Sequence, residues 1–146
     1  MSAGHICRRD VDTASYDENV LDAARRMRDR QVGTVVVVDG MRPVGIVTDR
    51  DLTVRVLAQG LSPQATRLSD IMTPSPTTVR EEDSIETALG YMRTGRFRRL
   101  PVIGRDGRLL GILALDDVLE LVAEDLTAVG ELLRREAPHR WVGRQT

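Results

Sequence analysis

"GIVTDRDL" (45–52) is written a second time in this chain as "GILALDDV" (111–118). Each copy begins with glycine and a run of small or apolar residues, and each has aspartate at its seventh position, Asp51 or Asp117. The hydroxyl of Thr48 is missing from the second copy, where Ala114 stands. The repetition predicts a fold built twice, and the lost hydroxyl predicts that the two copies differ in function.

The similarity extends outward from these segments to residues 19–52 and 84–118. The second copy has one inserted residue where "DGMR" becomes "GRDGR". An insertion at a turn costs little free energy, so this alignment is physically reasonable. An internal repeat therefore organises most of the chain.

Each copy predicts an amphipathic helix near its start. Apolar residues at i, i+3, i+4 and i+7 run from Val20 to Met27 and from Ile85 to Met92. Asp17 in the first copy, and Asp83 or Ser84 in the second, are candidate N-caps. A short extended segment precedes each helix, at 11–15 and 76–79.

Two strands and a second helix follow in each copy. Apolar, β-branched runs predict strands that are buried on both faces. These lie at 34–38 and 100–104, and tight turns at Asp39-Gly40 and Asp106-Gly107 lead back into strands at 44–48 and 109–114. The second helix of the first copy is expected from about Arg50 to Gly60. In the second copy an apolar stripe from Leu115 to Leu133 predicts a helix of about 20 residues, which Pro138 ends.

The predicted fold class is therefore α/β (α+β), with two tandem β-α-β-β-α repeats and a long C-terminal helix. Units of about 60 residues are marginal alone, so their sheets are expected to pack on each other with pseudo-two-fold symmetry. The expected boundaries are repeat 1 (7–62), an ordered linker (63–76), repeat 2 (77–122), a helical extension (123–137) and a tail (138–146).

Composition excludes several classes of protein. The chain has 146 residues, 41% of them hydrophobic, and a formal net charge of −1, so the basic excess of a nucleic-acid binder is absent. The single cysteine, Cys7, allows no intramolecular disulfide and fits a reduced, cytoplasmic setting. No apolar run approaches the ~18 residues of a membrane span, and residues 1–11 do not resemble a signal peptide.

Catalysis is not expected either. His5 and His139 lie near the two ends of the sequence, away from any plausible nucleophile. The chain has no P-loop, serine-centred elbow or zinc-binding spacing. We therefore expect no enzyme activity, no metal site and no required cofactor.

The ordered repeat resembles the cystathionine-β-synthase (CBS) domain pair, or Bateman module. Two β-α-β-β-α copies with a glycine–apolar–apolar–Thr–x–x–Asp segment carry the resemblance, together with "LSDIMTPSPTTV" (68–79) and "RFRRLPVIGRDGRLLGIL" (96–113). It covers roughly residues 7–122. The resemblance implies a regulatory module that binds adenine nucleotides or related adenosyl ligands between its repeats, and that commonly dimerises into a flat disc.

Thr48 and Asp51 suit a nucleotide on chemical grounds as well. Their i, i+3 spacing places them on one side of a helix's first turn. A carboxylate can accept both hydroxyls of a ribose, and the helix N-terminus can meet a phosphate. Alternatively, Thr48 or Asp49 serves only as a helix cap.

The resemblance implies that each cleft borrows residues from the other repeat. To Thr48 and Asp51 the main cleft adds Thr77, Thr78, Val79, Arg98, Arg99, Pro101 and Ile112. Arginine is a natural phosphate partner because its guanidinium is a fixed, permanently charged fork.

The second cleft is expected to be degenerate. It keeps Asp117 but has Ala114, and it borrows Asp12, Thr13, Ala14, Gly33, Thr34 and Ile46. Gly33 and Thr34 stand where the main cleft has arginines. One lost charge-assisted hydrogen bond costs ~1.5–3 kcal/mol, so a phosphorylated ligand should bind this cleft at least ~10-fold more weakly.

The sequence thus predicts a non-enzymatic sensor that binds AMP, ADP, ATP or S-adenosylmethionine and signals to a protein partner, as a homodimer. The alternative is a structural adaptor dimer that keeps the fold and binds a protein partner without nucleotide. The C-terminal apolar stripe would then be a protein-docking or dimer surface. DNA binding is a distant third, because no recognition-helix pattern accompanies the arginines.

Overall fold

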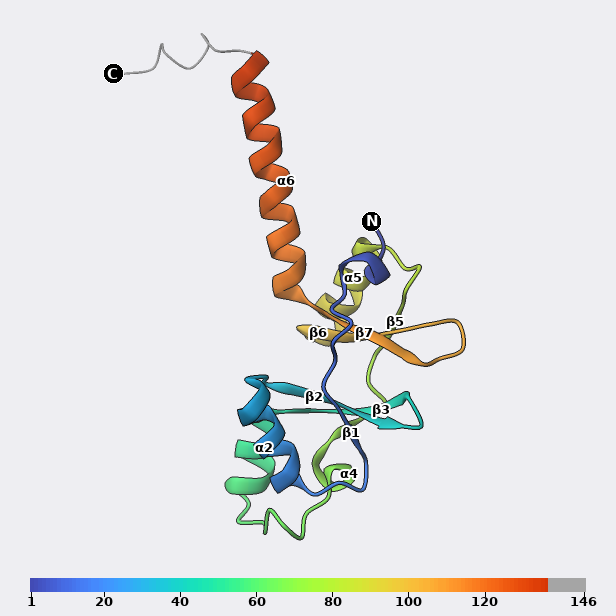
Figure 1. Ribbon diagram of the computed structural model, residues 1–146, viewed down its shortest axis with the longest axis vertical. Helices are drawn as coiled ribbons and strands as arrows, with labels where there is room; N and C mark the ends of the chain where they lie inside the picture. Colours follow the sequence, from blue (N-terminus) through green and yellow to red (C-terminus); the bar gives the residue numbers. More distant parts are fainter. Residues whose placement is uncertain (137–146) are drawn as a thin grey trace, which may run out of the picture.

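The computed structural model describes residues 1–136, which form a mixed α+β body with a long helix projecting from it (Figure 1). The predicted tail (138–146), the stop at Pro138, and His139 lie outside the described residues. Within residues 1–136, no helix combines the length and the apolar character needed to cross a membrane.

The two repeats have the predicted order of elements. The first contains β1 (Thr13–Ser15), α2 (Val20–Arg30), β2 (Thr34–Asp39), β3 (Arg42–Thr48), α3 (Asp49–Asp51) and a π-helical segment η1 (Leu52–Leu57). The second contains β5 (Val79–Arg80), α5 (Ile85–Gly95), β6 (Arg99–Ile103), β7 (Leu109–Ala114) and α6 (Leu115–Glu136). Short elements precede each repeat. The helix α1 (Ala3–Ile6) precedes the first, whereas α4 (Leu68–Ile71) and β4 (Thr73–Pro74) lie between the repeats and precede the second.

The two sheets share one topology. In the first, of order β1-β2-β3-β4, β1 is parallel to β2 and the other pairs are antiparallel. In the second, of order β5-β6-β7, β5 is parallel to β6 and β6 is antiparallel to β7. Thr73 of β4 pairs with Ile46, and an isolated bridge pairs Arg8 with Ile112 in the equivalent place. The segment before each repeat therefore extends the sheet of the other repeat.

The same exchange appears in the two hydrophobic cores. Leu68 and Ile71 of α4 are buried in the core of the first repeat, whereas Ala3 and Cys7 are buried in the core of the second. The sequence boundaries assigned Cys7 to the first repeat and residues 68–71 to a linker. A single helical turn cannot bury its apolar side chains alone, so each turn packs on the nearest open sheet edge.

The sheets also bury their second faces. Val36 of β2 and Pro101 of β6 are fully buried although they belong to neither core cluster. Because side chains alternate along a strand, both lie on the face opposite the helix-covered one. Figure 1 shows the two sheets next to each other, with α2 and α4 beyond one and α5 beyond the other. The predicted sheet-to-sheet packing is confirmed.

Two local predictions differ in detail. Asn19, not Asp17, caps α2, because its side chain accepts the Asp22 N–H at 2.9 Å; Ser84 caps α5 as one of the two alternatives predicted. The first hairpin turns at Gly40 and Met41, both with positive φ (57° and 78°), one residue later than expected. Positive φ at both central residues gives the tight turn that matches the strand twist.

Candidate functional site

Two clefts lie where the strand-to-helix junction of one repeat faces the other repeat. The larger, which we term the Thr48 cleft, has a volume of about 480 Å³. Its lining consists of Thr34, Ile46, Thr48, Arg50, Asp51, Thr73, Pro76, Thr77, Arg96, Phe97, Arg98 and Arg99. Its volume is in the range of small-molecule sites, ~300–1,000 Å³.

Thr48 and Asp51 form a helix cap as well as part of this cleft. The Thr48 hydroxyl accepts the Asp51 N–H at 3.2 Å, and an Asp51 carboxylate oxygen accepts the Thr48 N–H at 2.8 Å. The other Asp51 oxygen lies 3.6 Å from the Arg55 guanidinium. An ionised carboxylate has about four lone-pair sites. Capping therefore leaves acceptor capacity on Asp51 that a ligand hydroxyl can use.

The Thr48 cleft is strongly basic. Four arginines and one aspartate line it. Arg96 ends α5 in a left-handed conformation (φ 57°), after which the chain carries Arg98 and Arg99 to the mouth of the cleft. Arg98 is 71% exposed and makes one long contact, 3.5 Å, with Asp116. With only this contact within residues 1–136, Arg98 keeps donor groups that can bind an anion such as a phosphate.

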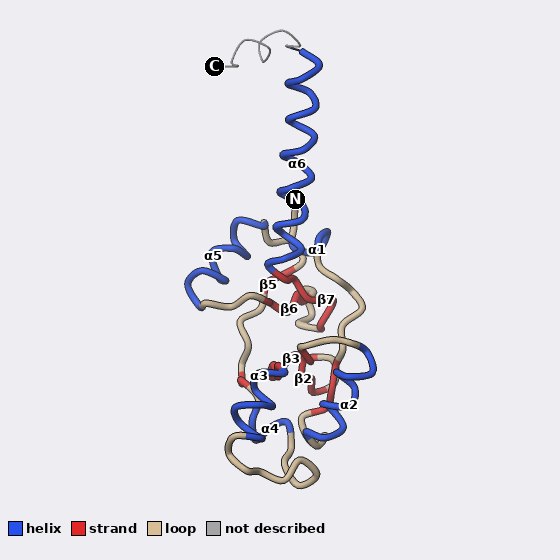
Figure 2. The backbone as a smooth tube through the Cα atoms, turned by 90° about the vertical axis from the view of Figure 1, so that its left-hand side faces the viewer, coloured by secondary structure: helices blue, strands red, loops and turns tan. Residues whose placement is uncertain are grey.

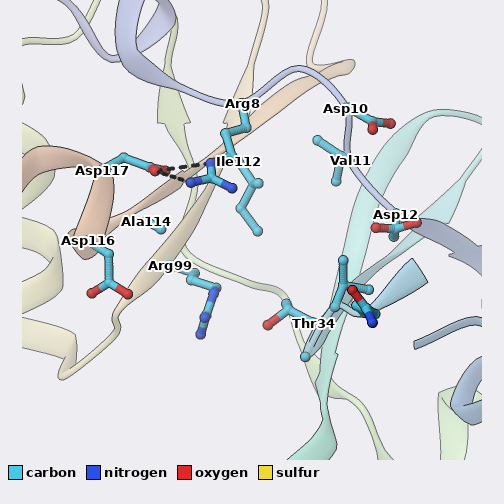
Figure 3. Close-up of a pocket in the computed structure, with 13 residues that line it drawn as sticks. Arg8, Asp10, Val11, Asp12, Thr34, Arg99, Ile112, Ala114, Asp116 and Asp117 are labelled. Carbon is cyan, nitrogen blue, oxygen red and sulfur yellow. Dashed lines mark hydrogen bonds and ion pairs between the residues drawn. The ribbon is translucent and has the colours of Figure 1, made fainter. Parts of the chain in front are cut away.

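The second cleft, which we term the Asp117 cleft, is smaller and acidic. It has a volume of about 290 Å³ and is lined by Arg8, Asp10, Val11, Asp12, Gln31, Val32, Gly33, Thr34, Arg99, Ile112, Ala114, Asp116 and Asp117 (Figure 3). Four aspartates thus face two arginines, the reverse of the balance in the Thr48 cleft.

An ion pair occupies the Asp117 cleft. Arg8 Nε donates a hydrogen bond of 3.0 Å to Oδ1 of Asp117, whose side chain is only 9% exposed, and Arg8 Nη2 lies 2.9 Å from the same oxygen as an ion pair (Figure 3). The other Asp117 oxygen is buried and has no hydrogen-bond partner within residues 1–136. Arg30 pairs with Asp10 at 3.0 Å and also with Asp12. The carboxylates of this cleft are thus largely held by the chain's own arginines.

The structure brings together five residues predicted for the main cleft: Thr48, Asp51, Thr77, Arg98 and Arg99. The remaining four are not among its lining. Val79 and Pro101 are buried in the protein interior, Thr78 lies outside both linings, and Ile112 lines the Asp117 cleft.

The predicted second cleft is assembled in a similar way. Asp117, Ala114 and Thr34, with Asp12 and Gly33, line the Asp117 cleft. Thr13 is absent from that lining, and Ala14 is 4% exposed within the first core.

The two isoleucines are exchanged relative to their predicted places. Ile46 lines the Thr48 cleft and Ile112 lines the Asp117 cleft. Ile46 and Thr48 are two residues apart on one strand, as are Ile112 and Ala114, so each pair shares a face. Each isoleucine therefore lines the cleft at the strand-to-helix junction of its own strand.

Arg8 is the most consequential residue that the sequence analysis missed. At the repeat's offset it aligns with Thr73, which lines the Thr48 cleft. Extending the alignment backward from residue 19 could have found it. Arg50, Arg96 and Phe97 were also missed, although two of them belong to the "RFRR" segment already noted.

Within the described part of the chain, no group of three or more histidine, cysteine or acidic side chains could hold a metal ion. The fold and the two clefts define a tandem-repeat module with ligand-sized sites between its repeats.

Comparison with known proteins then identifies the family. The family model of the CBS domain matches residues 3–58 and 68–124, and the chain belongs to this family. The Methanopyrus kandleri protein MK0525 is 34% identical over 136 residues, which cover 92% of this chain and 69% of that protein. Some relatives are much longer: the chain spans 19% of the Arabidopsis thaliana protein CBSCBSPB3, at 39% identity over 73% of this chain.

Solved structures agree with this assignment. A putative signal-transduction protein with CBS domains from Burkholderia ambifaria superposes with a TM-score of 0.77 at 31% identity, covering 86% of this chain and 96% of that one. The CBS domain protein PAE2072 from Pyrobaculum aerophilum, solved in complex with AMP, superposes with a TM-score of 0.74 at 26% identity, covering 84% and 99%.

Proposed function

We propose that this protein is a non-enzymatic sensor that binds an adenine nucleotide or adenosyl ligand in the Thr48 cleft and signals its occupancy to a protein partner. The observation that carries this proposal is the charge of the cleft. Four arginines and one capping aspartate surround a cavity of about 480 Å³. That composition suits a ligand with a hydroxyl-bearing sugar and a phosphate.

Each part of the ligand has a suitable partner. Asp51 accepts ribose hydroxyls, Arg98 and Arg99 meet the phosphate, and Ile46 with Phe97 offers apolar surface to the base. Phe97 is 37% exposed, so its ring is available for stacking. The AMP complex of PAE2072 supports this class of ligand.

Under this proposal the Asp117 cleft binds phosphorylated ligands weakly. The predicted reasons were the missing hydroxyl at Ala114, the lack of arginines at positions 33 and 34, and the charge of Asp12. Arg8 and Arg99 nevertheless both line the cleft. Arg8 is already bound to Asp117, and four aspartates repel a phosphate. A neutral or cationic ligand is therefore the better match for this cleft.

The two clefts share Thr34 and Arg99, which line both. A ligand in one cleft therefore touches residues that belong to the other, and its binding biases their conformation. A partner protein would read this change. Homodimerisation, a cytoplasmic setting and a role in energy sensing belong to the same proposal.

Isothermal titration calorimetry with AMP, ADP, ATP and S-adenosylmethionine tests the proposal directly. We expect at least one of them to bind with a stoichiometry of one per chain. Failure of all four to bind at millimolar concentration would exclude the sensor function.

Matched variants test which cleft is used. Asp51→Asn keeps an acceptor for the cap but removes the charge that strengthens bonds to ribose hydroxyls, so we expect ~10-fold or weaker nucleotide binding. Asp117→Asn should change binding less than ~3-fold, because its carboxylate faces the acidic cleft. Equal losses in calorimetry of both variants would refute the asymmetry between the clefts.

The structural adaptor is the second candidate. The observation in its favour is the exposed apolar stripe of α6, in which Leu126 is 67% exposed. An adaptor would bind none of the four nucleotides, so the same calorimetry separates the two functions.

A further inference from the structure

The free part of α6 has an apolar seam with no partner among residues 1–136. The helix leaves the body after its first turn and projects from it (Figure 2). Beyond this turn six large apolar side chains, Leu119, Val122, Leu126, Val129, Leu132 and Leu133, are 46–67% exposed. A helix this amphipathic is ordinarily stabilised by packing of its apolar face.

The seam has the spacing of a coiled coil. Leu115, Leu119, Val122, Leu126, Val129 and Leu133 follow one another in alternate steps of four and three residues. This is a heptad pattern with leucine at every a position, and leucine or valine at every d position. The family match ends at residue 124, so the second half of the seam lies beyond the matched repeats.

The charges of α6 are segregated along its length. Its first half carries five acidic residues and no basic one (Asp116, Asp117, Glu120, Glu124, Asp125), whereas its second half is neutral, with Arg134 and Arg135 balanced by Glu131 and Glu136. In a parallel pair of such helices, every acidic residue would lie level with the same residue of the second chain. An antiparallel pair sets the acidic half of one copy beside the neutral half of the other, which separates the acidic groups, and it also opposes the helix dipoles.

Packing among residues 1–136 does not explain Gly130. A Cβ at this position would have no heavy atom within 4 Å, yet glycine inside a helix costs ~1 kcal/mol relative to alanine. In the heptad Gly130 and Ala123 both flank the seam at e positions. Antiparallel pairing places Gly130 opposite Ala123 of the second copy, and two small residues there let the helices approach closely.

We propose that α6 binds the α6 of a second copy of this chain, side by side and antiparallel. In the matching register Val122 opposes Leu133 of the second copy and Leu126 opposes Val129, so the four central layers of the seam are apolar. Leu119 lies level with Glu136 at the end of the overlap. This interface lies on the projecting helix and is independent of the proposed nucleotide binding. The bodies of the two copies then stand at opposite ends of the helix pair.

Sedimentation velocity of the full chain over a concentration series tests the interface. We expect a monomer–dimer equilibrium in which Leu126→Gln raises the dimer Kd at least ~100-fold, because two buried leucines are lost per dimer. Glu124→Gln is the matched control on the opposite face and should change Kd less than ~3-fold. Circular dichroism checks that both variants fold.

Cysteine crosslinking tests the direction. Under mild oxidation, a Val122→Cys chain mixed with a Leu133→Cys chain should form a disulfide-linked dimer. Neither should crosslink with itself, because antiparallel copies of residue 122 lie about 16 Å apart along the axis. The wild-type chain reports any background from Cys7.

Three results would overturn the proposal. The first is a wild-type chain that stays monomeric up to about 1 mM, a concentration that reveals even weak association. The second is a dimer whose Kd is unchanged by Leu126→Gln. The third is self-crosslinking of the Val122→Cys chain as fast as the mixed pair, which indicates parallel helices. None of these measurements depends on a nucleotide. Failure of the proposed nucleotide binding would therefore leave the test of the α6 interface intact.

Discussion

Gly45 and Gly111, the first residues of the two repeated segments, are packing residues. The Met72 side chain lies over Gly45, and the Cys7 side chain lies over Gly111. Both neighbours come from the segment that precedes the opposite repeat. Burial raises the pKa of the Cys7 thiol, although Arg9 opposes the shift. The thiol is thus neutral at pH 7 and acts as a small apolar group at this contact.

The two glycines are expected to differ in tolerance to substitution. A Cβ at Gly111 would lie 2.7 Å from the Arg8 carbonyl oxygen, so Gly111→Ala must move backbone and should cost ~1–3 kcal/mol of unfolding free energy. The three heavy atoms nearest a Cβ at Gly45 all belong to the flexible Met72 side chain, so Gly45→Ala should cost less. Urea denaturation measures both.

Gly90→Ala serves as the control, because a Cβ there has no neighbour within 4 Å in helix α5. It should stabilise the protein by ~0.5–1 kcal/mol. A Gly111→Ala protein as stable as the wild type would show that the N-terminal segment does not pack on β7 as described.

At the scale of elements, the exchanged segments join the repeats. The helix α1 packs in the second core and α4 packs in the first, and each follows the same course over its sheet. The N-terminal segment also delivers Arg8 to Asp117. Neither repeat therefore has a complete core or a complete cleft by itself, and the two should unfold together.

A charge introduced at a buried position of α1 tests whether the two repeats unfold together. Ala3 is fully buried, so Ala3→Glu should destabilise the protein by about 3 kcal/mol or more. His5→Glu introduces the same side chain two residues away at an exposed position and should cost less than about 0.5 kcal/mol. The measurement is thermal unfolding followed by circular dichroism. If Ala3→Glu unfolded only part of the chain, in a separate transition, the cooperation would be refuted.

At the scale of the whole molecule, the hairpins of the two repeats also touch. The Leu109 N–H donates to the Met41 carbonyl at 2.8 Å, which links the start of β7 to the turn before β3. The paired sheets, exchanged segments and touching hairpins form one body, from which α6 projects (Figures 1 and 2). The molecule thus has a compact part with two clefts and a projecting part available for association.

Solution scattering should reveal the consequence of antiparallel α6 pairing. With the bodies at opposite ends of a helix 22 residues long, about 33 Å at 1.5 Å per residue, the pair-distance distribution of the dimer should have two maxima. Leu126→Gln at the same concentration should give the single maximum of a monomer. A single maximum for the wild-type dimer would indicate a disc in which the bodies touch.

Much of the fold could be predicted from the sequence because its signals are local. Helix periodicity at Val20 and Ile85, buried strands around 34–38 and 100–104, and the repeated Thr-x-x-Asp or Ala-x-x-Asp junction all act within a few residues. The meeting of Thr48 and Asp51 with Arg98 and Arg99 followed from the family resemblance, and the structure places all four in one cleft.

The sequence by itself determined two repeats and their elements, whereas the place of Arg98 and Arg99 beside Thr48 came from the family resemblance. Only the tertiary structure decided that Arg8 pairs with Asp117, that Thr34 and Arg99 serve both clefts, and that each isoleucine stays with its own junction. These features depend on which distant sheet edge receives the segment before each repeat. That choice rests on burying apolar side chains such as Ala3 and Leu68 in the opposite repeat, and no local pattern specifies it.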